Sequence, residues 1–137
     1  MASTLSHTLD TNVISAIVRA PSGPVAAKLR TTGTDRVCCS IVVAAELRFG
    51  VERRRAARLR ATVEGVLERI GVLPLDAPAD RAYATLRTAL EAEGKLIGAN
   101  DMLIAAHALG AGLTLVTDNV REFSRIDGLV IENWLDR

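Results

Sequence analysis

Short apolar runs alternate with longer stretches of helical spacing along the whole chain. Apolar residues that recur every three or four positions predict helices, and short apolar runs bounded by turn residues predict strands. The expected strands are residues 8–10, 37–41, 71–75, 113–117 and 129–131. The expected helices are residues 13–18, 25–29, 42–49, a segment that ends at residue 70, a segment from 78 through 90, and 100–109. Strands that alternate with helices favour a mostly parallel sheet, so we expect one α/β domain over residues 1–137, a three-layer α/β/α sandwich.

A few residues mark where these elements begin or end. Gly50 is a possible interruption after the third helix. Pro74 favours an edge position for the third strand, because proline cannot donate a hydrogen bond to a neighbouring strand. Asn100 is expected to cap the last long helix, which Gly110 and Gly112 would end.

Four acidic residues fall at the ends of the expected strands or at the start of the following helices. Asp10 ends the first strand and Asp118 follows the fourth, whereas Glu46 lies about one turn into the helix after the second. Asp101 stands beside Asn100 at the start of a helix. Because ligands bind beyond the carboxyl ends of the strands in parallel sheets, we expect these carboxylates to converge.

Three of the acids, taken alone, have an ordinary structural explanation. Glu46 does not, because an acid seldom occupies a largely apolar helical stretch without a partner. Asp10 suits a helix cap, Asp101 a favourable place in the helix dipole, and Asp118 a turn. Taken together, converging carboxylates raise one another's pKa unless a cation neutralises them. Oxygen-only ligands suit Mg²⁺ or Mn²⁺ rather than zinc, and such ions commonly act on phosphates. The four acids therefore predict a metal site for phosphate chemistry.

The formal net charge of +1 gives the chain as a whole no electrostatic preference for nucleic acid. Arginines are nevertheless crowded between Arg48 and Arg60. This stretch is either a solvated helix face or a surface that binds RNA phosphates or an acidic partner.

Adjacent Cys38 and Cys39 lie in an apolar run, which predicts buried reduced thiols rather than a disulfide. The sequence shows no secretory leader pattern and no apolar run of membrane length, so we expect a cytoplasmic protein without membrane association. Neither His7 nor His107 has the spacing of a catalytic triad, and His107 is two turns past Asp101, so neither is expected to face the ion.

The four acids lie within four ordered motifs. These are Leu9-Asp10-Thr11-Asn12, Ser40-Ile41 through Ala45-Glu46-Leu47, Ile97-Gly98-Ala99-Asn100-Asp101 to Ile104-Ala105-Ala106-His107, and Leu115-Val116-Thr117-Asp118-Asn119 with Arg121-Glu122-Phe123 and Glu132-Asn133-Trp134. In this order they resemble the motifs of PIN domains, and specifically of the VapC-type toxins of bacterial type II toxin–antitoxin pairs. The resemblance spans essentially the whole chain.

This resemblance implies an endoribonuclease toxin that hydrolyses RNA phosphodiester bonds by metal-activated water, with Mg²⁺ as the cofactor or Mn²⁺ in its place. It puts Asp10, Glu46 and Asp101 at the catalytic, metal-binding positions. We expect Asp118 to complete the set, although many PIN domains carry their last acid at the position that Asn119 occupies here. The residues expected to orient carboxylates or waters are Thr11, Asn12, Ser40, Thr117 and Asn119.

The resemblance also implies an antitoxin of the VapB type as a partner, in a homodimer or a toxin–antitoxin hetero-oligomer. The expected contacts to RNA or to the antitoxin are Arg48, Arg53, Arg54 and Arg55. The apolar face of the helix that ends at residue 70 fits a docking groove or an ordinary core.

The main alternative is a catalytically silent PIN domain that binds RNA or protein, and the retained acids argue against it. A phosphotransfer receiver domain would need two adjacent acids after the first strand. A haloacid-type phosphatase would need an aspartate where Asn12 stands. A DNA nuclease of the same architecture would usually carry more acids and more helices.

Overall fold

Five short parallel strands form the sheet of the computed structural model, which describes residues 4–135. The strands are β1 (His7–Leu9), β2 (Val37–Ser40), β3 (Val72–Leu73), β4 (Thr114–Val116) and β5 (Ile131–Glu132). The helices are α1 (Thr11–Arg19), α2 (Pro24–Thr32), α3 (Ile41–Arg54), α4 (Ala57–Ile70), α5 (Ala79–Ala92), α6 (Ala99–Ala111) and α7 (Val120–Phe123), with a 3-10 turn η1 (Thr34–Arg36).

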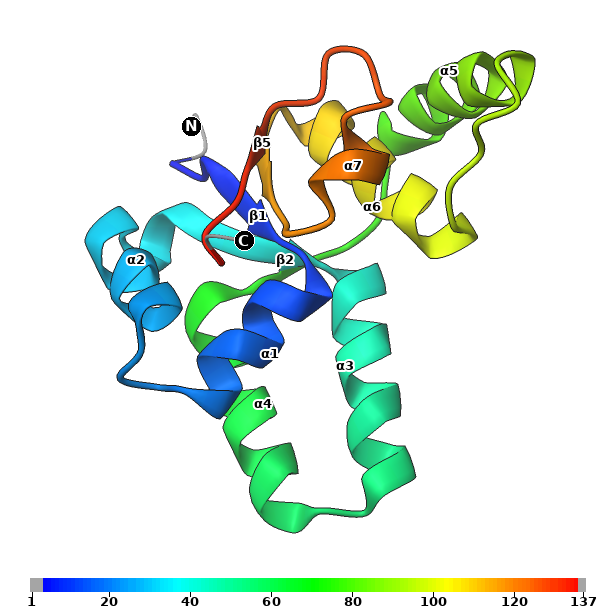
Figure 1. Cartoon of the computed structure of the whole chain (residues 1–137). Coiled ribbons are helices and arrows are strands. Elements are labelled where there is room, and N and C mark those ends of the chain that lie inside the picture. The colour runs from blue at the N-terminus through cyan, green and yellow to red at the C-terminus, as the bar shows by residue number, and fades with distance from the viewer. Residues whose placement is uncertain (1–3, 136–137) are drawn as a thin grey trace.

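The strand order is β3-β2-β1-β4-β5, so β1 lies at the centre between β2 and β4. The chain moves outward from β1 to β3 and then crosses back to β4 on the other side. Because crossovers between parallel strands are right-handed, the helices before and after this reversal cover opposite faces of the sheet. Figure 1 shows α1, α2 and α4 on one side and α5, α6 and α7 on the other. The expected three-layer α/β/α sandwich is confirmed, and β3 is an edge strand as Pro74 predicts.

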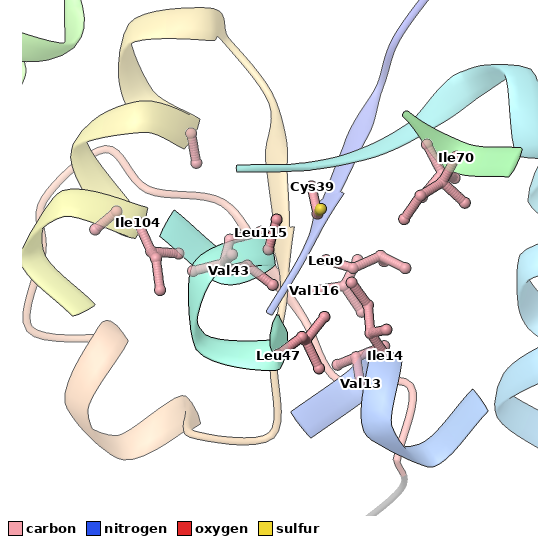
Figure 2. Close-up of a cluster of buried hydrophobic side chains, with 14 of the residues drawn as sticks. Leu9, Val13, Ile14, Cys39, Val43, Leu47, Ile70, Ile104, Leu115 and Val116 are labelled. Atoms are coloured by element: carbon pink, nitrogen blue, oxygen red, sulfur yellow. The ribbon is translucent and has the colours of Figure 1, made fainter. Parts of the chain in front are cut away.

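Aliphatic side chains from β1, β4 and the helices on both faces make the core. Leu9, Leu115 and Val116 are fully buried. Figure 2 shows them packed with Val13, Ile14, Val43, Leu47 and Ile104 from the surrounding helices. Burying one such side chain contributes about 1.5–3 kcal/mol, so these contacts hold the strand ends that carry the acidic residues. The apolar face of α4 joins this core instead of forming an exposed groove; its buried residues are Val63, Val66, Leu67 and Ile70.

Several predicted boundaries are wrong, three of them with a clear physical reason. Gly50 does not interrupt α3, which continues to Arg54 and ends where Arg55 takes a left-handed conformation with φ 52°. Gly98, not Asn100, is the residue before α6, because the extended backbone ends at Gly98 and Asn100 already lies in the first turn. The last strand is Ile131–Glu132 rather than 129–131, because Leu129 is still bonded to the turn through Ile126 O.

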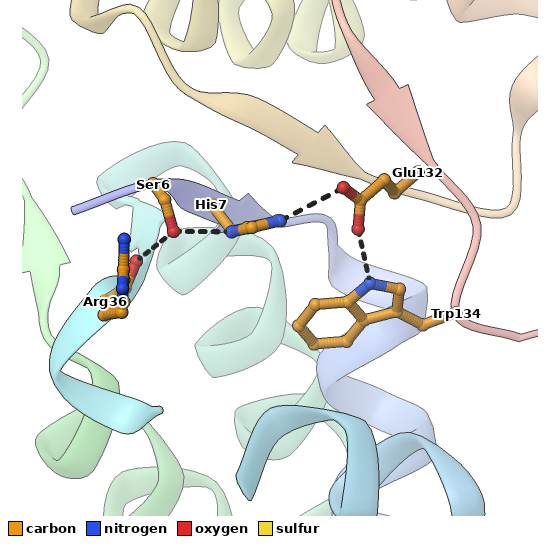
Figure 3. Close-up of polar contacts among 5 residues, drawn as sticks. All are labelled: Ser6, His7, Arg36, Glu132 and Trp134. Atoms are coloured by element: carbon orange, nitrogen blue, oxygen red, sulfur yellow. Dashed lines mark hydrogen bonds and ion pairs between the residues drawn. The ribbon is translucent and has the colours of Figure 1, made fainter. Parts of the chain in front are cut away.

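A chain of polar contacts ties β5 across β4 to β1 (Figure 3). The Glu132 carboxylate accepts a hydrogen bond from Trp134 Nε1 at 3.0 Å and lies 3.2 Å from His7 Nε2. On the other side of the ring, His7 Nδ1 is 2.6 Å from Ser6 Oγ. The hydrogen bond from Trp134 lowers the pKa of Glu132, with a smaller contribution from His7. These contacts hold the C-terminal strand in place.

No helix within residues 4–135 is both long enough and apolar enough to cross a membrane.

The contact between α5 and α6 should be sensitive to a single methyl group at Gly110. A Cβ there would lie 3.1 Å from Ala79 N and 3.2 Å from its Cα, both backbone atoms that yield little. We expect Gly110→Ala to lower the free energy of unfolding by about 1 kcal/mol, because overpacking outweighs the gain in helix propensity. Urea denaturation measures the change.

Gly65 in α4 is the matched control, since a Cβ there meets no atom within 4 Å. Gly65→Ala should raise the free energy of unfolding by about 0.5–1 kcal/mol. An equal rise for Gly110→Ala would contradict the close packing of α6 on the start of α5.

Candidate active site

The site lies at the carboxyl edge of the sheet, where β1 and β4 run side by side. Leu9 pairs with Val116, and the Asp10 backbone N–H donates to Val116 O at 2.9 Å. Asp10 therefore leaves β1 at the level where the chain leaves β4 toward Thr117. The strand order reverses between these two strands, which is where open parallel sheets form their ligand crevice.

Asp10 is held in this crevice by two hydrogen bonds and is only 5% exposed. Thr117 Oγ1 donates to Asp10 Oδ2 at 2.7 Å, and the Thr11 backbone N–H donates to Oδ1 at 2.8 Å. The second bond also makes Asp10 the N-cap of α1. Burial nevertheless raises the pKa of Asp10, and the charges of Glu46 and Asp118 raise it further. The helix-cap explanation and the functional one thus both apply to this residue.

The other acids on the α1 side are held by neighbours of Asp10. Thr11 Oγ1 donates to Glu46 Oε1 at 2.6 Å, which joins the start of α1 to the second turn of α3. Asn12 Nδ2 donates to Asp118 Oδ1 at 3.1 Å. Asp118 thereby stands with the other carboxylates. Its neighbour Asn119 donates its backbone N–H to Thr117 Oγ1 at 3.1 Å and precedes α7.

Asp101 enters from the opposite face of the sheet, in the first turn of α6. Burial raises its pKa to about 6, and the negative charges of Asp10, Glu46 and Glu122 contribute to this rise. Within residues 4–135, no ion pair joins Asp10, Glu46 or Asp101 to a lysine or an arginine. The structure therefore brings the four predicted acids to one pocket, where the negative charges of Glu46 and Asp118 act on Asp10 and those of Asp10 and Glu46 act on Asp101.

Two residues of this pocket were not expected to belong to the site. Glu122 adds negative charge at Asp101 from α7. It follows the predicted acid Asp118 by only four residues, and this closeness in sequence was the available signal. Asn100, expected to be a cap, instead points its amide at the site, where Nδ2 lies 3.5 Å from Glu46 Oε2.

As for Asn119, no side-chain hydrogen bond from Ser40 to a carboxylate is found among the described residues. Its hydroxyl accepts a hydrogen bond from the Val42 backbone N–H at 3.1 Å, which caps α3. The same oxygen lies 2.8 Å from His107 Nδ1 in the interior. Ser40 therefore acts on the helix that carries Glu46 rather than on the acid itself.

The donor set suits a hard cation, since it consists of carboxylate, amide and hydroxyl oxygens. Among the described residues, however, no three His, Cys, Asp or Glu side chains are grouped closely enough to share one ion. An ion here would rest on one or two carboxylates and complete its shell with water, as Mg²⁺ usually does in proteins. The residues present therefore fit magnesium or manganese.

A cleft of about 390 Å³ leads from the acids between α1, α3 and α4. Thr11, Asn12 and Glu46 line its inner end, and the basic residues along it are Arg19, Arg53 and Arg54. The exposed Phe49 ring lies beside this group, with the Arg53 guanidinium 5.5 Å from its centroid.

The remaining two predicted basic contacts lie elsewhere. Arg48 forms a bidentate pair with Glu64 on α4, at 2.8 and 3.0 Å. Arg55 is the exposed C-terminal cap of α3. Only Arg53 and Arg54 of the predicted set therefore line the cleft that holds Glu46.

Replacing Asp101 by asparagine should stabilise the protein when no divalent ion is present. A pKa of about 6 in the folded state, against an ordinary 3.8, means that ionised Asp101 costs stability above pH 6. The cost disappears below pH 3.8, where the carboxyl group is protonated in both the folded and the unfolded state. We expect Asp101→Asn to raise the free energy of unfolding by about 1–2 kcal/mol at pH 8 in EDTA. The advantage should fade as the pH falls toward about 4.

Asp127→Asn, which changes an exposed carboxylate outside the acidic pocket, is the control. It should stay within about 0.5 kcal/mol of wild type at both pH values. A lower melting temperature for Asp101→Asn than for wild type at pH 8 would contradict the crowding of charge.

The PIN domain family model matches residues 8–129 of the chain. Ribonuclease VapC2 of Rickettsia felis is 35% identical over 130 residues, which cover 93% of this chain and 97% of the relative. The tRNA(fMet)-specific endonuclease VapC of Shigella flexneri is 36% identical, over 95% of this chain and 98% of its own. A chain in the crystal structure of VapBC2 from Rickettsia felis, bound to a promoter DNA fragment, superposes with a TM-score of 0.88 and 32% identity, covering 95% of this chain and 99% of that one. The chain therefore belongs to the PIN-domain family, among the VapC ribonucleases.

Proposed function

We propose that this protein is a Mg²⁺-dependent endoribonuclease, with Mn²⁺ able to replace Mg²⁺, and that it is the toxin of a toxin–antitoxin pair. The observation that carries the proposal is the group of carboxylates at the β1–β4 crevice, of which Asp10, Glu46 and Asp101 form no ion pair with a basic side chain within residues 4–135. Such a group binds a divalent cation, because the cation relieves the repulsion and the cost of burial together. The names of the relatives, ribonuclease and tRNA-specific endonuclease, support RNA as the substrate.

A bound magnesium ion supplies two things to the reaction: it lowers the pKa of water and it offsets negative charge on the phosphoryl oxygens. The protein holds the ion's ligands rigidly. Thr117 and the Thr11 N–H fix both oxygens of Asp10, and the Thr11 hydroxyl fixes one oxygen of Glu46. Each of these donors leaves lone pairs of the carboxylate free to face the crevice.

Asp101 couples the site to pH. With its pKa at about 6, this carboxyl group keeps its proton in mildly acidic solution. Carboxylates must lose their protons to bind a metal, so cation binding and proton release are linked at this residue. Activity should accordingly decline on the acidic side of neutrality.

The cleft between α1, α3 and α4 leads the substrate to the acids. Arg53 and Arg54 offset the negative charge of an incoming phosphate chain along a path that ends at Glu46. The same basic, partly aliphatic cleft suits an acidic and apolar segment of a VapB-type antitoxin, which would silence the enzyme by occupying it. The similarity to a chain of VapBC2 supports this partner. The protein would then exist as a homodimer or as a hetero-oligomer with its antitoxin. We place the protein in the cytoplasm, where buried free thiols such as Cys38 and Cys39 stay reduced.

Asp10→Asn should abolish RNA cleavage while leaving the fold intact, because it removes a buried ligand and its charge but keeps the shape of the side chain. We expect at least about a 100-fold loss in the rate of RNA hydrolysis with Mg²⁺ or Mn²⁺, and a similar loss for wild type in EDTA. Cleavage is followed on total RNA with purified protein, and tRNA(fMet) is probed first. In a bacterial host, induction of wild type should arrest growth and induction of Asp10→Asn should not.

Asp127→Asn serves here too as the control and should cleave like wild type. If wild-type protein leaves RNA whole with both metals and is harmless on induction, the proposed function fails. Equal cleavage by Asp10→Asn and wild type would show instead that these acids are not the catalytic ligands.

The cleft arginines should affect substrate binding rather than the chemical step. We expect the double variant Arg53→Ala/Arg54→Ala to raise KM for RNA about tenfold with little change in kcat. The slope of log kcat/KM against log salt concentration should become shallower by about two units, as expected for the loss of two phosphate contacts. The matched control is Arg81→Ala on α5, on the opposite face of the sheet, which should leave KM unchanged. A fall in kcat at constant KM would contradict this role.

A further inference from the structure

The contact between Ser40 and His107 joins the two helices that bring Glu46 and Asp101 to the site. Ser40 is the last residue of β2 and caps α3, and His107 lies in the second half of α6. Their side chains are 2% and 6% exposed, and Ser40 Oγ is 2.8 Å from His107 Nδ1. A buried pair of this kind has no water to replace the partner, so breaking it leaves polar atoms unsatisfied.

One assignment of the protons satisfies every group in this contact. Ser40 Oγ already accepts from the Val42 N–H, so its own hydrogen is free to donate to His107 Nδ1. The Pro74 backbone acts on the His107 ring as an acceptor, and with Nδ1 facing Ser40 this leaves Nε2 to carry the hydrogen. Burial lowers the pKa of His107 and keeps the ring neutral. Each group in this chain thus donates and accepts with a defined direction.

Helices α3 and α6 run in opposite directions where they touch, since Ser40 at the start of α3 meets His107 near the end of α6. Glu46 and Asp101 lie at the other end of this helix–helix contact. Glu46 is six residues after Ser40, and Asp101 is six residues before His107, a rise of about 9 Å along each helix. At that end Asn100 Nδ2 reaches Glu46 Oε2 at 3.5 Å, and the charge of Glu46 acts on Asp101. Midway, Val43 and Ile104 are buried in the core cluster that Figure 2 shows.

Among the described residues, the other contacts along this interface fix the axial position of one helix against the other less firmly. Packing of Val43 on its apolar neighbours is non-directional and tolerates a small slide. The Asn100–Glu46 contact is long and Asn100 is exposed, while Glu46 and Asp101 repel each other. Among residues 4–135, the bond between Ser40 and His107 is the one buried side-chain hydrogen bond that links the start of α3 to α6.

We propose that the Ser40–His107 hydrogen bond is a positioning contact that fixes the axial register of α6 on α3 and thereby the separation of Glu46 from Asp101. The inference rests on the proposed function, since it concerns the same carboxylates. Ser40 and His107 are positioning residues: they act through the helices and touch neither ion nor RNA.

Two substitutions at His107 separate the bond to Ser40 from the rest of the ring's contacts. The amide of His107→Asn lies where Nδ1 lies and keeps a partner for Ser40, whereas the amide of His107→Gln reaches toward Nε2 and the Pro74 carbonyl. Each variant keeps one hydrogen bond and loses the other. Ser40→Gly removes the hydroxyl with little loss of helix capping, because glycine is tolerated at this position.

The variants are compared in kcat and KM for RNA cleavage, in thermal stability, and in Mn²⁺ affinity measured by calorimetry without RNA. We expect His107→Gln and Ser40→Gly to lower kcat and Mn²⁺ affinity about 10- to 100-fold with KM for RNA unchanged. His107→Asn should stay within about threefold of wild type in both. The double variant Ser40→Gly/His107→Gln should be no worse than either single one, because both remove the same bond.

Each remaining outcome overturns the proposal in a different way. If wild type cleaves RNA and all three single variants cleave equally well, the contact does not position the acids. If His107→Asn and His107→Gln lose activity and stability alike, His107 is merely structural. If wild type neither cleaves RNA nor binds Mn²⁺, the proposed function fails and the positioning role falls with it.

Discussion

The repulsion among carboxylates at the β1–β4 crevice is the constraint on which the rest of this structure depends. Asp10 is almost completely buried, and Asp101 has a pKa raised to about 6 by burial and by its acidic neighbours. A fold that has to hold such groups together against their charge needs a rigid frame. The apolar packing of β1 and β4 supplies this frame, since Leu9, Leu115 and Val116 are inaccessible to solvent and anchor the segments that carry Asp10 and Asp118.

Short polar side chains next to each acid complete the frame at little entropic cost. Thr11 follows Asp10 in sequence and donates to it through the backbone and to Glu46 through the hydroxyl. Thr117 precedes Asp118 and donates to Asp10. One threonine on each strand end therefore links acids that are far apart in sequence. Hydroxyl groups suit this task, because they orient a carboxylate without neutralising it.

The fold and the four acids were predictable because their signals are local. Strands and helices follow from apolar spacing, and Asp10 and Asp118 lie directly after strands, so a parallel sheet must bring them to one edge. The pairing of Ser40 with His107 was not predictable, since 67 residues separate them and each alone suits a cap or a core position. Glu122 and Asn100 were likewise missed, because their roles depend on how α7 and α6 dock. Asn100 was misassigned because Gly98 takes the extended backbone that starts the helix.

The sheet ends on both sides in strands of only two residues, Val72–Leu73 and Ile131–Glu132. A sheet edge is a template on which another chain can add a strand, and its danger grows with its length. Here Pro74 follows one edge directly and removes a backbone donor, while the Glu132 side chain puts charge on the other. Both edges therefore offer little to a strand of another chain, and the longer exposed surfaces of the protein are those of its helices.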